Sequence, residues 1–192
     1  MLVVDLMTRD VITVKKDTPV LEALKIMQQH GFRRLPVVDE DGHPIGVVSQ
    51  VSIEKLKPQS GLPMIWQSGP WASRRTVGEV MNKKPVTVKP TDTVEHATSK
   101  AQNARVGSLL VVENGKIVGI VTTNDIFYGV VNPTLGIGEP GSRVVVVGGG
   151  TGENAEAVLG AINRLGVGIK VIWAIYSPNN KKNNLVVHLE TE

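Results

Sequence analysis

The sequence predicts an α/β (α+β) fold in which two copies of a β-α-β-β-α unit are followed by a small β-α-β-β domain. Three observations support this prediction. An internal repeat fills the first two thirds of the chain, each copy holds two β-branched runs around a turn, and a different strand and helix pattern begins near residue 141. We therefore expect two small sheets, each backed by helices, and a third sheet in the last part of the sequence.

The internal repeat fixes the organisation of the chain. Three segments return in the same order and with the same character: Met7–Val14 as Met81–Val88, Leu35–Asp39 as Leu109–Glu113 and, after a one-residue deletion, Gly42–Ser49 as Gly115–Thr122. A duplicated unit defines an architecture more firmly than any single motif. We therefore expect one repeat at residues 1–56 and a second at residues 76–132, joined by a linker at residues 57–75.

The first two elements of each repeat are a short strand and an amphipathic helix. In the first repeat, Ile12–Val14 is a β-branched segment, and the apolar positions that follow it have helical spacing. Thr18 in the first repeat and Asp92 in the second precede these positions. We therefore expect each of them to cap its helix.

A hairpin and a second helix complete each repeat. Asp41–Gly42 and Asn114–Gly115 separate pairs of β-branched runs, and these dipeptides are strong signals for two-residue hairpin turns. Ser49 and Thr122 follow the hairpins and are suited to begin the last helices. Because one repeat of about fifty residues buries too little surface to be stable alone, we expect the two copies to pack face to face.

The linker is rich in Pro and Gly, and it also contains Trp66 and Trp71. We expect these two tryptophans to anchor the loop on the repeats. The alternative is an exposed apolar patch that binds a partner protein.

The segment 141–192 is predicted to form the third sheet. Its expected elements are the strand Arg143–Val147, the helix Asn154–Leu165 and the strands Ile169–Tyr176 and Leu185–Leu189. The glycine-rich turn Gly148–Gly152 has two interpretations. It is a connection within a small α+β domain, or it cradles a phosphate at the helix N-terminus, although no Gly-Lys-Ser/Thr follows as in a Walker loop.

The composition excludes several classes of site. The 192 residues are 41% hydrophobic and 20% charged, include no cysteine and carry a formal net charge of +3. Thiolate-bound zinc, disulfides and a cysteine nucleophile are therefore excluded. We expect no metal site because the histidines are scattered, at His30, His43, His96 and His188. No apolar run reaches the roughly 20 residues of a transmembrane helix, and the first residues lack the pattern of a signal peptide, so we expect a cytoplasmic protein without a membrane partner.

Three motifs carry a family resemblance: Asp5–Thr8, Arg33–Asp39 and Gly119–Ile126. Together, and duplicated, they resemble the CBS domain family, in which two copies form a pseudo-twofold pair often called a Bateman module. The resemblance extends from residue 1 to about residue 130. It implies a tandem CBS-domain pair that binds a nucleotide between its two copies.

The resemblance implies one complete nucleotide site. In the family, the Thr-x-x-Asp motif after the second hairpin holds the ligand, which here assigns Asp125 to the ribose hydroxyls and Thr122 to phosphate. A carboxylate suits a diol because it only accepts hydrogen bonds, and amides at a helix N-terminus favour an anion. The other repeat completes the site with Ile12, Thr13, Val14, Arg33, Arg34 and Leu35, and Arg105 is a further cation nearby.

Other roles remain open for the charged residues of this site. Asp125 also fits the first turn of a helix, where a carboxylate offsets the helix dipole. Arg33 and Arg34 also fit a solvated pair whose apolar stems pack on the domain. In favour of a ligand contact, a guanidinium can pair with phosphate through several donors, which a lysine cannot match.

The corresponding site of the first repeat departs from the family pattern. Ser52 stands where the second repeat has Asp125, so the ribose-binding carboxylate is absent. A neutral hydrogen bond is weaker than a charge-assisted one by about a factor of two. We therefore expect a degenerate second site, formed by Ser49, Ser52, Val86, Thr87 and Ser108.

The element order of residues 141–192, with its helix-to-Gly-x-Gly-Ile junction, is similar to the first half of an ACT domain, a small regulatory fold that often binds amino acids. The second helix and last strand of such a domain do not follow, so we expect an open sheet edge that another subunit covers. This interpretation predicts a homodimer. Whether the domain also binds a small molecule or only assembles subunits stays open.

These features predict a regulatory sensor that binds an adenosine-containing nucleotide, such as AMP, ADP, ATP, S-adenosylmethionine or NAD. We expect no catalytic cofactor and no catalysis, because no nucleophile with a base, carboxylate pair or metal cluster is visible in the sequence. One alternative is an assembly scaffold for a regulated protein partner, without a nucleotide. Another is a nucleic-acid-binding protein, suggested by the basic pairs Arg74–Arg75, Lys83–Lys84 and Lys181–Lys182.

Overall fold

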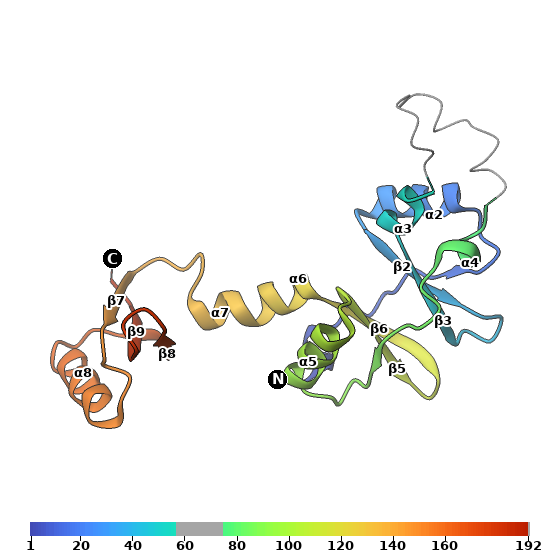
Figure 1. Cartoon of the computed structure of the whole chain (residues 1–192). Coiled ribbons are helices and arrows are strands. Elements are labelled where there is room, and N and C mark those ends of the chain that lie inside the picture. Colours follow the sequence, from blue (N-terminus) through green and yellow to red (C-terminus); the bar gives the residue numbers. More distant parts are fainter. Residues whose placement is uncertain (57–74, 192) are drawn as a thin grey trace, which may run out of the picture. The chain divides into compact units, whose positions relative to one another are not determined.

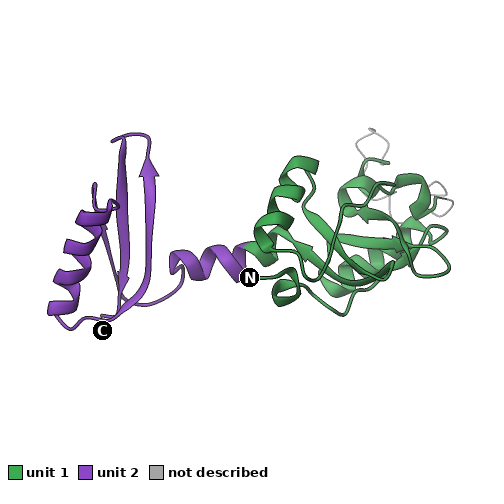
Figure 2. Cartoon of the chain, turned by 90° about the horizontal axis from the view of Figure 1, so that it is seen from below, with its two compact units in different colours: residues 1–126 green, residues 127–192 purple. Residues whose placement is uncertain are grey.

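The computed structural model describes residues 1–56 and 75–191. The chain divides into two compact units, Met1–Ile126 and Phe127–Glu192 (Figure 2). The expected anchors Trp66 and Trp71 lie outside the described residues. Within the described part of the chain, no helix combines the length and the apolar character needed to cross a membrane.

The first unit contains two three-stranded sheets with the same topology (Figure 1). The elements of the first repeat are α1 (Val3–Leu6), β1 (Val14–Lys15), α2 (Val20–His30), β2 (Arg34–Val38), β3 (Pro44–Ser49) and α3 (Gln50–Glu54). Those of the second are α4 (Val77–Val80), β4 (Thr87–Val88), α5 (Val94–Ala104), β5 (Ser108–Glu113), β6 (Lys116–Thr122) and α6 (Thr123–Ile126). In each sheet the first strand runs parallel to the second, which pairs antiparallel with the third. The predicted fold class and repeat are confirmed.

The short helices α1 and α4 were not predicted, and they are exchanged between the repeats. Val3 of α1 is fully buried in the hydrophobic core of the second repeat, and Val77 of α4 is fully buried in the core of the first. Backbone hydrogen bonds follow the same exchange, since Val3 N donates to Asp92 O at 2.9 Å and Val77 N donates to Thr18 O at 2.9 Å. Each core is therefore completed by the other repeat, which explains physically why the two copies form one unit.

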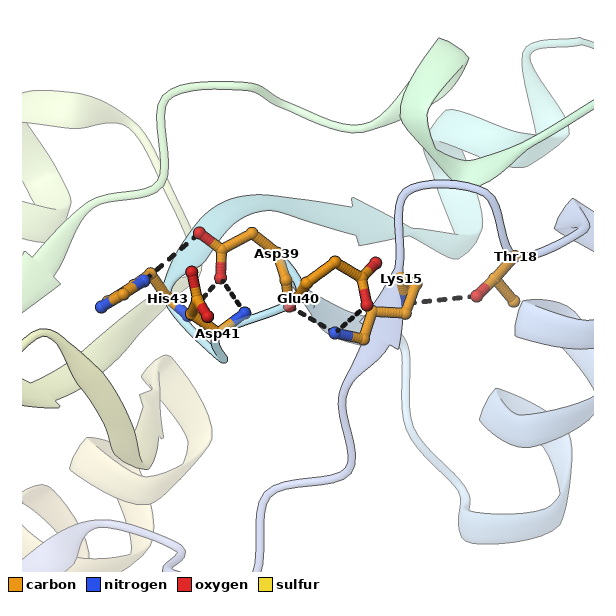
Figure 3. Close-up of polar contacts among 6 residues, drawn as sticks. All are labelled: Lys15, Thr18, Asp39, Glu40, Asp41 and His43. Carbon is orange, nitrogen blue, oxygen red and sulfur yellow. Dashed lines mark hydrogen bonds and ion pairs between the residues drawn. The ribbon is translucent and has the colours of Figure 1, made fainter.

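The two hairpins differ in their turns. Asn114 and Gly115 have φ values of 49° and 80°, as the predicted two-residue turn requires. The prediction of a two-residue turn at Asp41–Gly42 is wrong, because β2 ends at Val38 and β3 begins at Pro44. The carboxylate of Asp39 closes this longer turn by accepting hydrogen bonds from the backbone amides of Asp41 (3.0 Å) and His43 (2.8 Å) (Figure 3).

The expected helix caps are also displaced. Pro19 and Thr93 occupy the N-cap positions of α2 and α5, and the Thr93 hydroxyl accepts a hydrogen bond from His96 N. The expected caps instead hold the turn before each helix: Thr18 Oγ1 accepts from Lys15 N at 3.1 Å, and Asp92 Oδ2 accepts from Lys89 N at 2.9 Å. The polar residue that the sequence places near each helix start thus stabilises the preceding turn.

The second unit has the predicted strand and helix order. After η2 (Phe127–Val131) and α7 (Asn132–Leu135), it contains β7 (Ser142–Val146), α8 (Gly152–Arg164), β8 (Ile169–Ser177) and β9 (Lys182–Leu189). The strands form an antiparallel sheet in the order β7-β9-β8. Its core contains Ile162 of α8 and Leu185 and Val187 of β9. The similarity to half of an ACT domain stays a prediction.

The glycine-rich turn before α8 packs against the β8–β9 hairpin. Gly148 N donates to Asn184 Oδ1 at 3.2 Å, and Gly150 N donates to Asn183 O at 2.9 Å. A Cβ atom on Gly150 would lie 3.0 Å from the same Asn183 oxygen, so this position needs glycine for close packing. Because these amides already have partners within the unit, the geometry favours the connecting turn over the phosphate-binding loop.

Candidate functional site

A cavity of about 580 Å³ lies between the two repeats of the first unit. It brings together five of the residues predicted for the nucleotide site, namely Ile12, Arg33, Arg34, Thr122 and Asp125. The structure adds wall residues that sequence reasoning missed, including Thr8, Asp10, Val11, Phe32, Ile120 and Asn124. The wall thus presents carboxylates, guanidinium groups and apolar side chains to one space, as a pocket for a charged organic ligand requires.

A reciprocal backbone contact joins the repeats beside this cavity. Thr8 N donates to Ile120 O and Ile120 N donates to Thr8 O, both at 3.0 Å. Val47 and Asn82 make the equivalent pair at the related position, at 3.0 and 2.9 Å. Thr8 and Asn82 occupy equivalent positions of the repeated segments Met7–Val14 and Met81–Val88, so the duplication itself was the signal that could have placed Thr8 at this contact.

Asp125 and Thr122 are hydrogen-bonded to each other at the start of α6. Oδ2 of Asp125 accepts hydrogen bonds from Thr122 N at 2.7 Å and from Thr122 Oγ1 at 2.8 Å. Asp125 lies in the first turn of α6, as its alternative role requires, and it also takes part in local hydrogen bonds at the start of the helix. Both hydrogen bonds fall on Oδ2, and within the described parts of the chain Oδ1 makes none. The pair therefore holds a carboxylate oxygen in a fixed position at the cavity wall.

The backbone amides at the start of α6 are largely engaged. Thr122 N donates to Asp125, and Thr123 N donates to Gly107 O at 3.3 Å. The Thr122 hydroxyl proton is directed to Asp125 as well. The amides of Thr122 and Thr123 are therefore already used within the protein and are not free to bind an anion in the cavity. The exposed guanidinium groups of Arg33 and Arg34 are the strongest donors for an anion at this wall.

Four predicted residues do not line the cavity. Val14 and Leu35 are 5% and 0% exposed, and their side chains belong to the core of the first repeat. Thr13 is exposed beside β1 and is not part of the cavity wall. Arg105 ends α5 in the left-handed conformation, with φ of 52°, and is exposed outside the wall. Their roles in ligand binding stay predictions.

The related position in the first repeat keeps the local geometry without the carboxylate. Ser49 Oγ accepts from Ser52 N at 3.1 Å, and Ser52 Oγ donates to Ser49 O at 2.7 Å. Of the other predicted residues, Ser108 is buried and pairs with Thr122 across β5 and β6, while Val86 and Thr87 are half-buried around β4. The serine pair thus replaces a fixed negative charge with two neutral hydroxyls, each hydrogen-bonded to the backbone of the other serine.

The turn of the first hairpin gathers three potential metal ligands. Ligand atoms of Asp39, Asp41 and His43 lie within 4.8 Å of one another, although the histidines are scattered in the sequence. The backbone amide of His43 donates to Asp39 and holds the pKa of that carboxyl below its ordinary value. Figure 3 also shows Lys15 between Glu40 and the Asp39 carbonyl. These hydrogen bonds account for the arrangement as a turn, and we assign no metal to it.

Comparison with known proteins adds independent information about the first unit. A family model of the CBS domain matches residues 3–56 and 77–132. The chain is 29% identical over 126 residues to L-aspartate semialdehyde sulfurtransferase of Methanocaldococcus jannaschii, a match that covers 65% of this chain and 22% of that protein. The chain therefore spans about a fifth of the length of this curated relative.

Solved structures resemble the same part of the chain. The CBS domain pair of protein MJ0100, in complex with 5-methylthioadenosine and S-adenosyl-L-methionine, is 28% identical with a TM-score of 0.56, covering 67% of this chain and 98% of that one. CBSX2 in complex with AMP is 24% identical with a TM-score of 0.57, covering 68% and 97%, and this match concerns the fold alone. The MJ0100 pair, which is more than a quarter identical to this part of the chain, is thus a CBS domain pair that holds adenosine-containing ligands.

Proposed function

Since this chain belongs to the CBS domain family, we propose that its paired repeats bind an adenosine-containing nucleotide in the cavity between them, as a regulatory module that does not transform the ligand. The observation that carries this proposal is the meeting of Asp125 and Thr122 from one repeat with Arg33 and Arg34 from the other in one cavity. The volume of about 580 Å³ is in the range of small-molecule sites.

Each group has a distinct role in the proposed complex. Oδ1 of Asp125 accepts a hydrogen bond from a ribose hydroxyl, while Thr122 holds the carboxylate in place through Oδ2. The guanidinium groups of Arg33 and Arg34 pair with phosphate. Ile12 offers an apolar surface to the base. We also propose that backbone groups of Thr13, Val14 and Leu35 contact the edge of the adenine.

The ligand complex of MJ0100 supports the adenosine class, since that CBS pair holds 5-methylthioadenosine and S-adenosyl-L-methionine. AMP, ADP, ATP, S-adenosylmethionine and NAD all belong to this proposed class. The arginines favour a ligand that carries phosphate or another anion. The carboxylates of Asp10 and Asp125 in the same wall leave room for a ligand that also carries a cationic group.

A thermal-shift series tests the proposal directly. The wild-type chain is mixed with AMP, ADP, ATP, S-adenosylmethionine or NAD, and with GMP as a control. A ligand that binds the folded protein adds about 2.7 kcal/mol of stability at a hundred times its Kd, which raises the melting temperature. Asp125→Ala is expected to lose the shift, while Ser52→Ala, at the related position of the first repeat, is expected to keep it. Absence of a shift with every ligand would contradict the proposal and favour an assembly scaffold.

A regulatory role also requires a response to the ligand. We propose that the nucleotide changes the angle between the repeats, because the cavity wall belongs to both and only a difference in affinity can drive such a change. A regulated partner protein in the cytoplasm would respond to this change. Solution scattering of the free and ligand-saturated protein would overturn this part if the two curves coincide.

A second proposed feature is assembly as a homodimer through β8. This edge strand of nine residues exposes apolar side chains, with Ile172 40%, Ile175 54% and Tyr176 58% exposed. A long apolar edge strand offers unpaired backbone groups to another strand. The observation favours assembly through the second unit alongside nucleotide binding by the first.

A further inference from the structure

We propose that Gly107 is a positioning residue for the guanidinium group of Arg34, and that this pair gives the cavity its preference for phosphate-bearing ligands. The inference rests on the proposed function, because it concerns the same cavity. Gly107 is not a residue of the predicted site, and nothing in the nucleotide motif refers to it. Its role follows from what lies against it.

The guanidinium of Arg34 occupies the space of the missing side chain at Gly107. A Cβ atom built on Gly107 would lie 2.8 Å from Nη2, 3.2 Å from Cζ and 3.3 Å from Nη1 of Arg34. These are the three nearest atoms, so the first group to meet a side chain at residue 107 is the guanidinium. The φ angle of Gly107 is not positive, so its backbone conformation does not require glycine. An alanine would therefore fit the backbone and act on Arg34.

This contact crosses from one repeat to the other at the cavity. Arg34 begins β2 of the first repeat and lines the cavity. Gly107 directly precedes β5 of the second repeat, and its carbonyl accepts a hydrogen bond from the amide of Thr123, another wall residue. The guanidinium thus rests beside the start of α6, close to the element that carries Asp125.

The two repeats differ at the positions of this contact, and the difference makes room for the Arg34 side chain. By the sequence alignment of the repeats, Gly107 stands at the position of Arg33 and Ser108 at the position of Arg34. A second arginine pair at these positions would bring like charges to the place where Arg34 meets the second repeat, and a side chain at 107 would displace its guanidinium. Because the second repeat has Gly107 where the first repeat has Arg33, the guanidinium of Arg34 from the first repeat can lie against the second repeat.

The position matters for phosphate because several donors at the start of α6 are already engaged within the protein. Thr122 N and Oγ1 are directed to Asp125, and Thr123 N is directed to Gly107 O. A guanidinium presents several donors in a planar fork that matches phosphate geometry, and its strength as a partner depends on where that fork is held. Because Gly107 has no side chain, the exposed Arg34 guanidinium has room to lie at this position of the wall, and a side chain at residue 107 would push it away.

Calorimetry on the full chain with adenosine and AMP tests the inference. Gly107→Ala is expected to weaken AMP binding several-fold and to leave adenosine binding unchanged, since adenosine has no phosphate. In an Arg34→Ala background, where AMP binding is already weakened, Gly107→Ala is expected to have no further effect. Melting temperatures of the variants verify that each one is folded.

The outcomes separate the inference from the proposed function. If Gly107→Ala binds AMP as tightly as the wild type, or weakens AMP binding equally with and without Arg34, the positioning role is overturned while nucleotide binding stands. If Gly107→Ala weakens adenosine and AMP equally, the effect is not on phosphate and the inference is also overturned. If the wild type binds neither ligand, the proposed function fails and the inference fails with it.

Discussion

The thioether of Met7 lies directly over Gly119 in the first unit. A Cβ atom on Gly119 would be 2.5 Å from Sδ, 3.0 Å from Cγ and 3.2 Å from Cβ of Met7. The related pair repeats the arrangement, since a Cβ atom on Gly46 would be 2.6 Å from Sδ of Met81. The methionine that opens each repeated motif thus packs on a bare strand position of the other repeat and contributes to the contact between them.

Gly119→Ala is expected to lower the free energy of unfolding by about 1–3 kcal/mol, because overpacking a close contact forces neighbouring atoms to move. Chemical denaturation measures this change. In a Met7→Ala background the same substitution should cost less, because the added methyl group then finds space. An equal cost in both backgrounds would show that Met7 is not the group that the new methyl meets.

Asp125 has both a structural and a proposed ligand role, and two substitutions separate them. Asp125→Ala removes the acceptor for Thr122 N and Oγ1 and is expected to cost about 1 kcal/mol of stability, as loss of a helix cap does. Asp125→Asn keeps an acceptor oxygen and should retain more of that stability. Both should weaken adenosine binding measured by calorimetry, and unchanged affinity in Asp125→Asn would argue against a charge-assisted bond to ribose.

Ser52→Asp is expected to create a second ribose-binding position. Ser49 and Ser52 already form the same local pair as Thr122 and Asp125, with Ser49 N donating to Ser52 Oγ at 3.1 Å. An aspartate at residue 52 can therefore take the same hydrogen bonds and add the missing carboxylate. Calorimetry should give a higher number of adenosine molecules bound per chain, whereas Ser52→Ala should leave that number unchanged. An unaltered number in Ser52→Asp would contradict the view that the absent carboxylate alone prevents binding at this position.

Much of the fold could be predicted because the duplication and the turn signals are local properties of the sequence. The β-branched runs, the Asn114–Gly115 turn and the order of elements in the second unit needed no tertiary information. The exchange of α1 and α4 was not predictable in this way, because helices of four residues have no measurable periodicity. Thr18 and Asp92 stood near helix starts, but which turn they stabilise depends on where the helix begins.

The site was predictable only in part for the same reason. Asp125, Arg33 and Arg34 follow from a motif, whereas Asp10 and Phe32 enter the cavity because the two repeats approach each other. The role of Gly107 is the clearest case. A glycine offers no chemical group to a sequence analysis, and its effect becomes visible only when the side chain that fills its space is known.

The ion pair between Arg75 and Glu79 predicts a loss of stability in acid. Arg75 Nη1 lies 2.5 Å from Glu79 Oε2, and this hydrogen bond holds the pKa of Glu79 below its ordinary value. The folded state therefore favours the charged form, so the stabilisation is present above the unfolded-state pKa and is lost as the pH falls through the folded-state value. Denaturation between about pH 5 and pH 3 should show this loss in the wild type.

Glu79→Gln should flatten that part of the pH profile, because it has no carboxylate to protonate. Glu113→Gln is a matched control that changes the net charge equally at an exposed hairpin position. A profile in Glu79→Gln as steep as that of the wild type would assign the acid sensitivity to other carboxyl groups.

The edge strand β8 predicts self-association through the second unit. Antiparallel pairing of two copies centred on Trp173 would place Lys170 of each copy opposite Tyr176 of the other, so the cation of this strand meets no like charge. Ile175→Lys would place a charge on the exposed strand and is expected to give a monomer in analytical ultracentrifugation. Leu165 is 76% exposed at the end of α8 and lies outside β8. Leu165→Lys is therefore the control, and its molecular mass in the same experiment should equal that of the wild type. A wild-type chain that is monomeric at high concentration would contradict self-association through β8. Nucleotide binding by the first unit would not be affected by that result.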